Sequence, residues 1–324
     1  MKQWIIYLSC LFAATVTYPQ DTIHTFLRLS ADNDALIPTN NATDWGYTSG
    51  IRVDLFHSSP TLRGYFQGFN VYDHNDRFNT AGWGIMQKIY APKKTNLAIP
   101  DKNDYPYSGA LFLIRSFHSS YSKRKLNVLS ECVAGIMGPA SLGEQTHRFF
   151  HRLIKDPAPM GWDHQLPTDL LLNFNLQAEK FLTGSKNVGL IGTSQVRCGT
   201  MNDDLSVGLQ LQLGSTENYF KGLTNQSFAK NKPKFFFSIK TSADLILYNA
   251  LLQGGLLNKR SPVHDMNSTS GTDRKLNHLR GNAEIFFLFS LKKFAVSASQ
   301  KFSTSELKNY GSHSFGNISV YKTL

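Results

Sequence analysis

Apolar and polar residues alternate with a period of two through most of this chain. In residues 205–213, Leu or Val occupies every odd position, and Ser, Gly or Gln occupies every even one. Successive side chains on a strand point to opposite faces, so this pattern predicts strands with one apolar face and one polar or small face. A chain dominated by such segments folds mainly as β-sheet.

Twelve segments share this character, and Gly, Asn, Asp, Ser and Pro cluster between them. They are residues 23–31, 47–57, 81–91, 108–117, 125–137, 169–181, 187–198, 205–213, 235–248, 280–291, 294–302 and 314–323. Soluble strands average about five to six residues, whereas strands that cross a membrane need about nine to eleven. The lengths therefore favour an all-β, transmembrane, antiparallel barrel of about twelve strands.

A soluble β-sandwich or a propeller is the alternative architecture, although the sequence has no convincing internal repeat. The long polar segments 215–233 and 258–279 suit the extracellular side of a barrel. Mean hydropathy is only −0.27, and no segment after the first twenty residues offers the roughly 18 apolar residues of a spanning helix. This excludes a polytopic helical membrane protein, but a barrel needs no such run because closure satisfies its backbone.

The first twenty residues resemble a secretory signal peptide. Met1 and Lys2 precede an apolar stretch at residues 4–16 that is too short to span a bilayer,. We expect cleavage near residues 17–20, which leaves residues 21–324 as one barrel domain; a buried N-terminal helix is the alternative. Export argues against a nucleic-acid partner. The net charge of +11 then points to a phosphate-rich membrane surface.

Cys132 and Cys198 are the two cysteines that remain after such cleavage. They are compatible with one disulfide, but nothing in their spacing requires it.

One segment, residues 142–154, has helical spacing instead. Pro139 and Ser141 precede it, and Pro157 follows it, as is typical of a helix start and stop. Glu144, His147 and His151 then share one face. They suit either a zinc site or a general base, since a neutral His is the natural group to activate water near pH 7. A solvated helix face remains the simpler interpretation.

Three further groups of residues carry candidate chemistry. Asp32-Asn33-Asp34 ends the first strand, where carboxylate and amide oxygens suit Ca²⁺ or merely a turn. Thr48, on the second strand, is expected beside them because adjacent strands bring such residues together. Basic side chains near strand ends suit phosphate binding, although charge runs are often only solvated surface: Lys93, Lys94, Arg148 and Arg152,.

Taken in order, these motifs resemble the outer-membrane lipid A 3′-O-deacylases. The matching stretches span most of residues 21–324 and are strongest at 138–166. They are Asp32-Asn33-Asp34, Thr43-Asp44, 47–50 (YTSG), 87–92 (QKIYAP), 104–109 (DYPYSG), 138–145 (GPASLGEQ), His151, 161–166 (GWDHQL) and, more weakly, 248–254 (YNALLQG).

The resemblance implies a twelve-stranded barrel in the bacterial outer membrane, with its active site and a short helix near the outer rim. It implies Ca²⁺-dependent hydrolysis of the ester that holds the 3′-linked acyloxyacyl group of lipid A, in the lipopolysaccharide of the outer leaflet. His151 would be the base that activates water. Asn33 and Thr48 would be catalytic, and Asp34 with Asn33 would hold the metal. We expect a monomer.

Substrate contacts are expected from Lys93, Lys94, His147 and Arg148. Two positions depart from the family pattern. His147 stands where a Gln is usual, and a Lys-Arg pair of some members has no aligned copy, since Lys93 and Lys94 lie closer to Pro92.

Two other functions stay open at this stage. One is a non-catalytic pore or surface-binding barrel. The other is a lipase with a serine nucleophile, although the GxSxG elbow is absent. The joint presence of Asn33, Asp34, Thr48 and His151 favours the first hypothesis, because a pore needs none of them.

Overall fold

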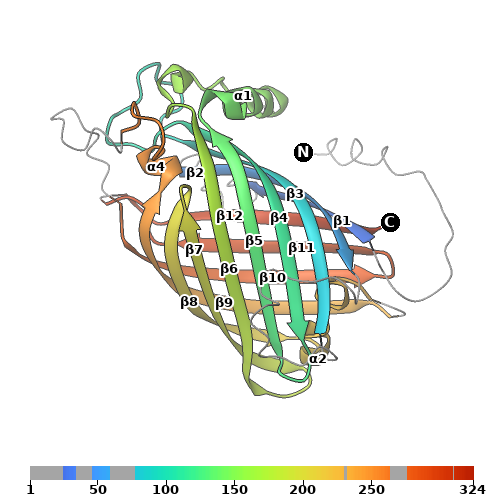
Figure 1. The fold of residues 1–324 in the computed structure, drawn as a ribbon. Coiled ribbons are helices and arrows are strands. Elements are labelled where there is room, and N and C mark those ends of the chain that lie inside the picture. The colour runs from blue at the N-terminus through green and yellow to red at the C-terminus, as the bar shows by residue number, and fades with distance from the viewer. Residues whose placement is uncertain (1–24, 34–45, 59–76, 230–231, 263–275, 309) are drawn as a thin grey trace.

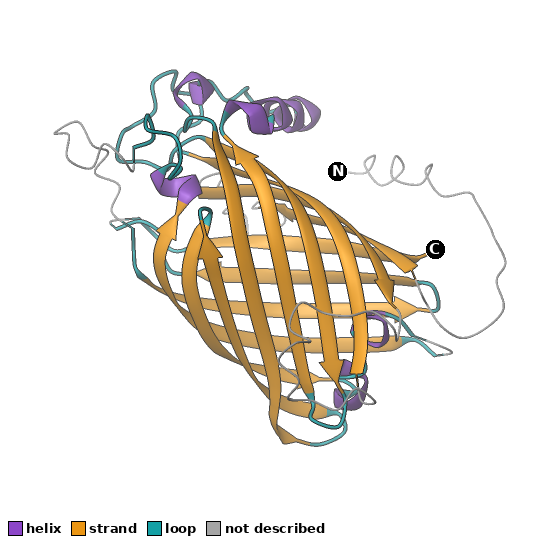
Figure 2. Cartoon of the chain, in the orientation of Figure 1, coloured by secondary structure: helices purple, strands orange, loops and turns teal. Residues whose placement is uncertain are grey.

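The computed structural model describes residues 25–33, 46–58, 77–229, 232–262, 276–308 and 310–324. They form a closed barrel in which each strand pairs antiparallel with its sequence neighbours, and β1 pairs with β12 (Figures 1 and 2). The strands are β1 (Thr25–Asn33), β2 (Gly46–Ser58), β3 (Arg77–Ala91), β4 (Ser108–Tyr121), β5 (Leu126–Met137), β6 (Asp169–Gly184), β7 (Val188–Gly199), β8 (Asn202–Leu213), β9 (Lys234–Asn249), β10 (Leu279–Leu291), β11 (Phe294–Ser303) and β12 (His313–Thr323).

The prediction of an all-β barrel with twelve antiparallel strands is confirmed. Every strand expected from the alternation is present, with ends that shift by up to four residues. In the described parts of the chain, no helix is both long enough and apolar enough to cross a membrane. The proposed signal peptide, residues 1–20, lies outside the described residues and stays a prediction.

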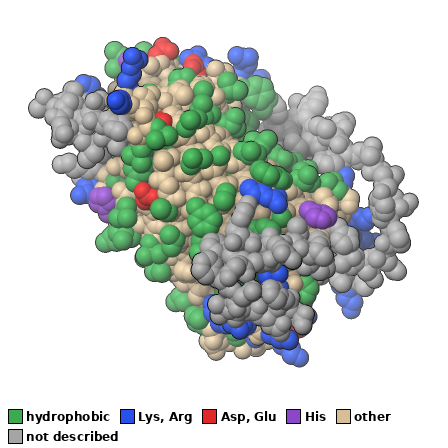
Figure 3. Space-filling view, in the orientation of Figure 1, with side chains coloured by type: hydrophobic (Ala, Val, Ile, Leu, Met, Phe, Trp, Pro, Cys, Tyr) green, Lys and Arg blue, Asp and Glu red, His purple; other side chains and the backbone are tan. Residues whose placement is uncertain are grey.

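The outer surface of the barrel is apolar, as the alternation requires. On β8, the side chains of Leu205, Val207, Leu209 and Leu211 are exposed on this surface. Figure 3 shows hydrophobic side chains spread over the strands, with clusters of Lys and Arg toward the two ends. This distribution matches a wall that faces lipid and two rims that face head groups.

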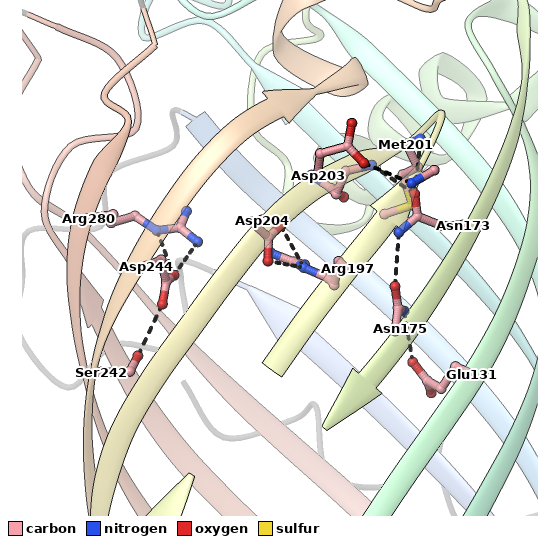
Figure 4. A network of polar contacts seen from close by, with 12 residues as sticks. Glu131, Asn173, Asn175, Arg197, Met201, Asp203, Asp204, Ser242, Asp244 and Arg280 are labelled. Carbon is pink, nitrogen blue, oxygen red and sulfur yellow. Dashed lines mark hydrogen bonds and ion pairs between the residues drawn. The ribbon is translucent and has the colours of Figure 1, made fainter. Parts of the chain in front are cut away.

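The lumen is polar and charged. Its cavity of about 550 Å³ has a wall that includes Arg28, Arg52, Lys88, Arg280, Asp32, Asp244 and Glu306. Arg280 donates to Asp244 at 3.0 Å and to Glu306 at 2.6 Å, and Arg197 pairs with Asp204 at 2.8 Å (Figure 4). Charges removed from water are tolerable only with such partners.

The segment between β8 and β9 corrects one expectation. Consecutive connections in a barrel alternate between its two ends, so the described residues 215–229 lie at the end where β1 begins and β12 ends (Figure 1). There α2 (Thr216–Tyr219) and α3 (Leu223–Ser227) lead to the buried Phe228, whose ring lies 5.3 Å from Phe26. The polarity of this segment reflects contacts within the barrel, since the Tyr219 hydroxyl donates to Glu179 at 2.7 Å.

The opposite end carries the other connections, including α1 (Gly143–Ile154) and α4 (Ala250–Gln253). The short turns at residues 122–125, 185–187 and 292–293 mark the first end as periplasmic,. The α1 end is therefore extracellular. Of the two long polar segments, the described ends of 258–279 are on the predicted side, and the described part of 215–233 is not.

The two cysteines are free. Cys132 on β5 and Cys198 on β7 are both in register with Phe174 of β6, which lies between them. Two strand spacings amount to about 10 Å between Cα atoms, beyond the roughly 7 Å limit for a disulfide.

Phe228→Ala should destabilise the barrel because it removes a buried ring from the cluster with Phe26 and Tyr321. We expect a loss of about 3–5 kcal/mol in the free energy of unfolding. The temperature at which the folded band disappears in semi-native electrophoresis measures it. Phe235→Ala, an exposed position on the outer surface of β9, is the control. Equal losses in the two variants would contradict the assignment of Phe228 to the core.

Candidate active site at the outer rim

The connection between β5 and β6 folds into three short helices, which confirms the helix expected at 142–154. They are η3 (Pro139–Ser141), α1 (Gly143–Ile154) and η4 (Gly161–His164). Gly138 begins the segment at a φ of 79°, a conformation that favours glycine,. Lys155 ends α1 with its backbone N–H donating to Arg152 and His151 carbonyls.

The helix α1 packs against the outer surface of β3 and β4 at their extracellular ends. Two contacts fix it there. The Gln87 side-chain amide donates to the Ser141 carbonyl at 2.8 Å, and Gly109 meets Gly143 so closely that a Cβ on Gly109 would lie 2.9 Å from the Gly143 Cα. Gln87 follows Trp83 and Ile85 on the same lipid-facing side of β3. The helix therefore lies outside the lumen.

Residues spaced by four form the face of α1 that meets the barrel: Gly143, His147 and His151. Both imidazoles are nearly inaccessible, at 3% and 4% exposure. Trp162 of η4 covers them and is itself fully buried with Ile89, Ala91 and Tyr107. A pair of histidines is thus enclosed between a helix and the outer wall of the barrel.

Hydrogen bonds determine which nitrogens of this pair carry protons. Trp162 Nε1 can only donate, and it lies 3.2 Å from His147 Nδ1,. A neutral His147 therefore carries its proton on Nε2, which lies 3.0 Å from His151 Nε2. His151 must accept there, so its own proton is on Nδ1, 2.7 Å from the Pro157 carbonyl oxygen. The chain leaves the lone pair of His151 on Nε2.

Electrostatics agree with this assignment. Burial, together with the smaller effects of the neighbouring His151 and Arg148, lowers the pKa of His147 to about 3,. His147 is therefore neutral at physiological pH. Asp156 Oδ2 lies 3.1 Å from His151 Nδ1, where a carboxylate favours a proton on that nitrogen. The arrangement suits a base whose lone pair is on Nε2, where it accepts from His147.

The outer surface of β1–β4 changes character toward this rim. One row in register is apolar and exposed: Leu29, Val53, Ile85 and Leu113. Four residues further along each strand, about 13 Å toward the extracellular end, the same face carries Asn33, Ser49, Ile89 and Gly109. Gly109 is the contact point of α1, so Asn33 lies in the row on which the helix is seated.

Asn33 and Thr48 are neighbours on β1 and β2, and they meet through the Thr48 backbone. The Asn33 side-chain amide donates to the Thr48 carbonyl at 3.4 Å. Thr48 is buried beside a β-bulge, and its hydroxyl donates to the Gly46 carbonyl at 3.3 Å. Asp34, the next residue after β1, lies outside the described residues. Asp32 of the same motif faces the lumen instead, where it accepts from the Tyr47 hydroxyl at 2.8 Å.

The predicted substrate-binding residues lie at the same rim. Lys93 and Lys94 are exposed in the connection between β3 and β4, where the Lys93 backbone N–H donates to Asp104 at 2.9 Å. Arg148 pairs with Glu144 at 2.8 Å. Glu144 is therefore the ion-pair partner of Arg148. The described residues contain no group of three His, Cys, Asp or Glu side chains that suits a zinc ion.

Sequence reasoning missed the partners of the histidine pair. Trp162 was part of a matching motif but received no role, and Asp156 was not singled out at all. Pro157 served only as a helix stop, although its carbonyl accepts from His151. The residue types alone gave little signal, since these contacts arise only when η4 folds back over α1.

Comparisons with known proteins agree with this architecture. The profile of the family described as "Outer membrane protein LpxR" matches residues 5–324. The chain belongs to the LpxR family. This confirms the resemblance drawn from the motifs, and it places the protein in the bacterial outer membrane.

LpxR from Salmonella typhimurium superposes with a TM-score of 0.72 at 19% identity, over 92% of this chain and 100% of that one. The β-domain of the Bordetella autotransporter BrkA gives a TM-score of 0.48 at 7% identity, over 93% and 99% of the two chains. No protein with a curated description matches the chain by sequence. The likeness to the Salmonella protein shows the shared barrel fold.

The Gln that the resemblance leads us to expect at position 147 also fits the structure. A Gln side chain has an oxygen that accepts from Trp162 and an amide that donates to His151. His147→Gln should therefore keep α1 docked. His147→Leu leaves the buried Trp162 N–H without an acceptor, at a cost of about 1–3 kcal/mol.

Tryptic cleavage within residues 138–168 measures the docking of α1. We expect faster cleavage in His147→Leu than in the parent and an unchanged rate in His147→Gln. Equal acceleration in both variants would contradict the hydrogen-bond chain.

Acid should loosen α1. His147 titrates near 6.5 when undocked and at about 3 when docked, so the undocked state binds more protons between these values. Docking is fully stable above about pH 6.5 and weakens as the pH falls, by up to about 1.4 kcal/mol per pH unit. Hydrogen exchange of the α1 amides, corrected for intrinsic rates, should show this dependence in the parent and a smaller one in His147→Gln. An identical dependence in both would exclude His147 as its source.

Proposed function

We propose that this protein hydrolyses the ester that holds the 3′-linked acyloxyacyl group of lipid A, with His151 as the general base. One observation carries the proposal. The chain from Trp162 through His147 fixes a neutral His151 with its lone pair on Nε2 and its proton on Nδ1. Membership of the LpxR family and the position of the pair at the outer rim support the choice of substrate.

The base can act when water takes the place of His147 at His151 Nε2. His151 Nε2 then removes a proton from the water, and the water oxygen attacks the ester carbonyl. Asp156 and the Pro157 carbonyl, both beside Nδ1, stabilise the imidazolium that forms. The proton finally passes to the sugar oxygen as the acyl–oxygen bond breaks. General bases typically contribute about 10²–10⁴-fold to such a step.

Ca²⁺ is the cofactor that the resemblance implies, and the donor chemistry at the end of β1 fits it. Asn33 donates through its side-chain nitrogen to Thr48, which directs its amide oxygen away from that contact. With the Asp34 carboxylate next in the sequence, this offers the hard oxygen ligands that Ca²⁺ prefers. Bound there, the ion would polarise the ester carbonyl.

The rim position suits a lipid with phosphates and several acyl chains. The ester lies between head group and chains, and the site lies just above the apolar rows of β1–β4. Lys93, Lys94 and Arg148 are placed to contact phosphate groups, and Thr48 is placed to orient water or substrate. His147, by contrast, contacts His151 and Trp162, so we assign it to positioning the base.

A conducting pore is the competing function, and the lumen argues against it. Phe26, Phe56, Phe228 and Tyr321 pack together toward the periplasmic end. A second apolar cluster toward the extracellular end includes Tyr47, Tyr90, Tyr105, Leu251 and Leu307. Steady conductance in planar bilayers without ester cleavage would favour the pore.

Purified protein in detergent should remove one acyloxyacyl unit from lipid A, as detected by mass spectrometry. His151→Ala should slow the reaction about 10²–10⁴-fold, whereas His164→Ala, an exposed histidine of the same connection, should not. Chelation should stop the reaction, and Ca²⁺ should restore it. Full activity in His151→Ala would refute the base, and unchanged lipid A with the parent protein would refute the function.

A further inference from the structure

The helix α1 has three distinct sides. An α-helix advances about 100° per residue, so the barrel-facing side with Gly143, His147 and His151 leaves two flanks. One flank carries Thr146, Phe149, Phe150 and Leu153, and the other carries Glu144, Arg148 and Arg152, while Gln145 points away from the barrel between them. The first flank is apolar apart from Thr146, and the second is charged.

Within the part of the chain that the structure describes, the apolar flank leaves two large side chains accessible: Phe149 is 56% exposed and Leu153 is 44%. Leu142 just before the helix and Met160 after it are exposed as well. Contiguous exposed apolar side chains of this kind mark contact with a membrane or another partner.

The direction of α1 decides which way this flank points. The helix starts against Gly109 of β4 and runs toward β3, to the right in Figure 1 with the extracellular end up. The barrel wall lies behind the helix in this view, so the His side points backward. In a right-handed helix that runs to the right, the flank that follows the His side in rotation then points up, toward the extracellular side. The flank that precedes it, with Phe149 and Leu153, points down toward the lipid-facing surface.

Two further observations fit this orientation. On the lipid-facing side of β3 and β4, below the row that holds Gly109, the exposed side chains include Ile85 and Leu113 in one row and Trp83 in the next, where Arg115 lies over the Trp83 ring. The apolar flank of α1 therefore continues a mainly apolar surface of the barrel. In Figure 3, hydrophobic side chains lie beneath the charged ones at the upper rim.

We propose that α1 is an interfacial helix whose apolar flank lies among the acyl chains of the outer leaflet. Arg148 and Arg152 on the upper flank then lie at the level of the lipid phosphates, the arrangement of a helix that rests in a membrane interface. The lipid layer, together with the barrel wall, holds the histidine pair in place. This inference concerns the seat of the helix and does not depend on the hydrolysis of lipid A.

Tryptophan substitutions on each flank test directly whether α1 lies in the membrane interface. Phe150→Trp and Leu153→Trp report on the lower flank, and Arg148→Trp, on the opposite side of the helix, is the control on the upper flank. Each variant is reconstituted into phosphatidylcholine vesicles with or without brominated acyl chains, and the emission of the parent protein is subtracted. Heat-modifiable migration in electrophoresis confirms that each barrel is folded.

We expect bromine to quench most of the added emission of Phe150→Trp and Leu153→Trp, and aqueous iodide to quench that of Arg148→Trp. Two lower-flank variants keep the test open if one of them fails to fold. Equal quenching of all three positions by either agent would overturn the proposal, as would quenching of the lower flank by iodide alone.

Discussion

Closure of the barrel is the constraint on which the rest of the structure depends. In lipid, every backbone N–H and C=O needs a partner within the protein, and pairing of β1 with β12 provides the last row of them,. Closure gives the wall one face toward lipid and one toward the lumen. It also fixes the register that carries Leu29 and Asn33 on the same outer face, one in the apolar belt and one at the rim.

The proposed active site uses the outer face of this wall, and the lumen plays a separate role. A helix seated on Gly109 encloses two histidines against β3 and β4, and Trp162 closes the enclosure from above. Burial keeps His147 neutral, and a neutral His147 between a donor and an acceptor has only one possible proton position. Packing thus determines which nitrogen of the proposed base carries the proton. The lumen instead carries paired charges between two apolar clusters, which stabilise the scaffold.

The twelve strands and α1 could be predicted from the sequence because their hydrophobic periodicity is a local pattern that does not depend on particular tertiary contacts. Prediction from the sequence failed where two different environments in the folded protein favour the same amino-acid composition. A polar segment suits solvent and a polar lumen equally, so residues 215–233 were assigned to the wrong end. Cys132 and Cys198 look like a possible pair until register places β6 between them. Trp162 and Asp156 gained roles only through the fold of η4 over α1, a long-range contact without a local signature.

The protonation pattern of the histidine pair is the central claim, and nitrogen NMR of ¹⁵N-histidine-labelled protein reads it most directly. Signals are assigned by comparison with His147→Gln and His151→Ala. At neutral pH, His147 should be neutral with its proton on Nε2, and His151 should be neutral with its proton on Nδ1. A charged His147, or a His151 with its proton on Nε2, would contradict the proposed base.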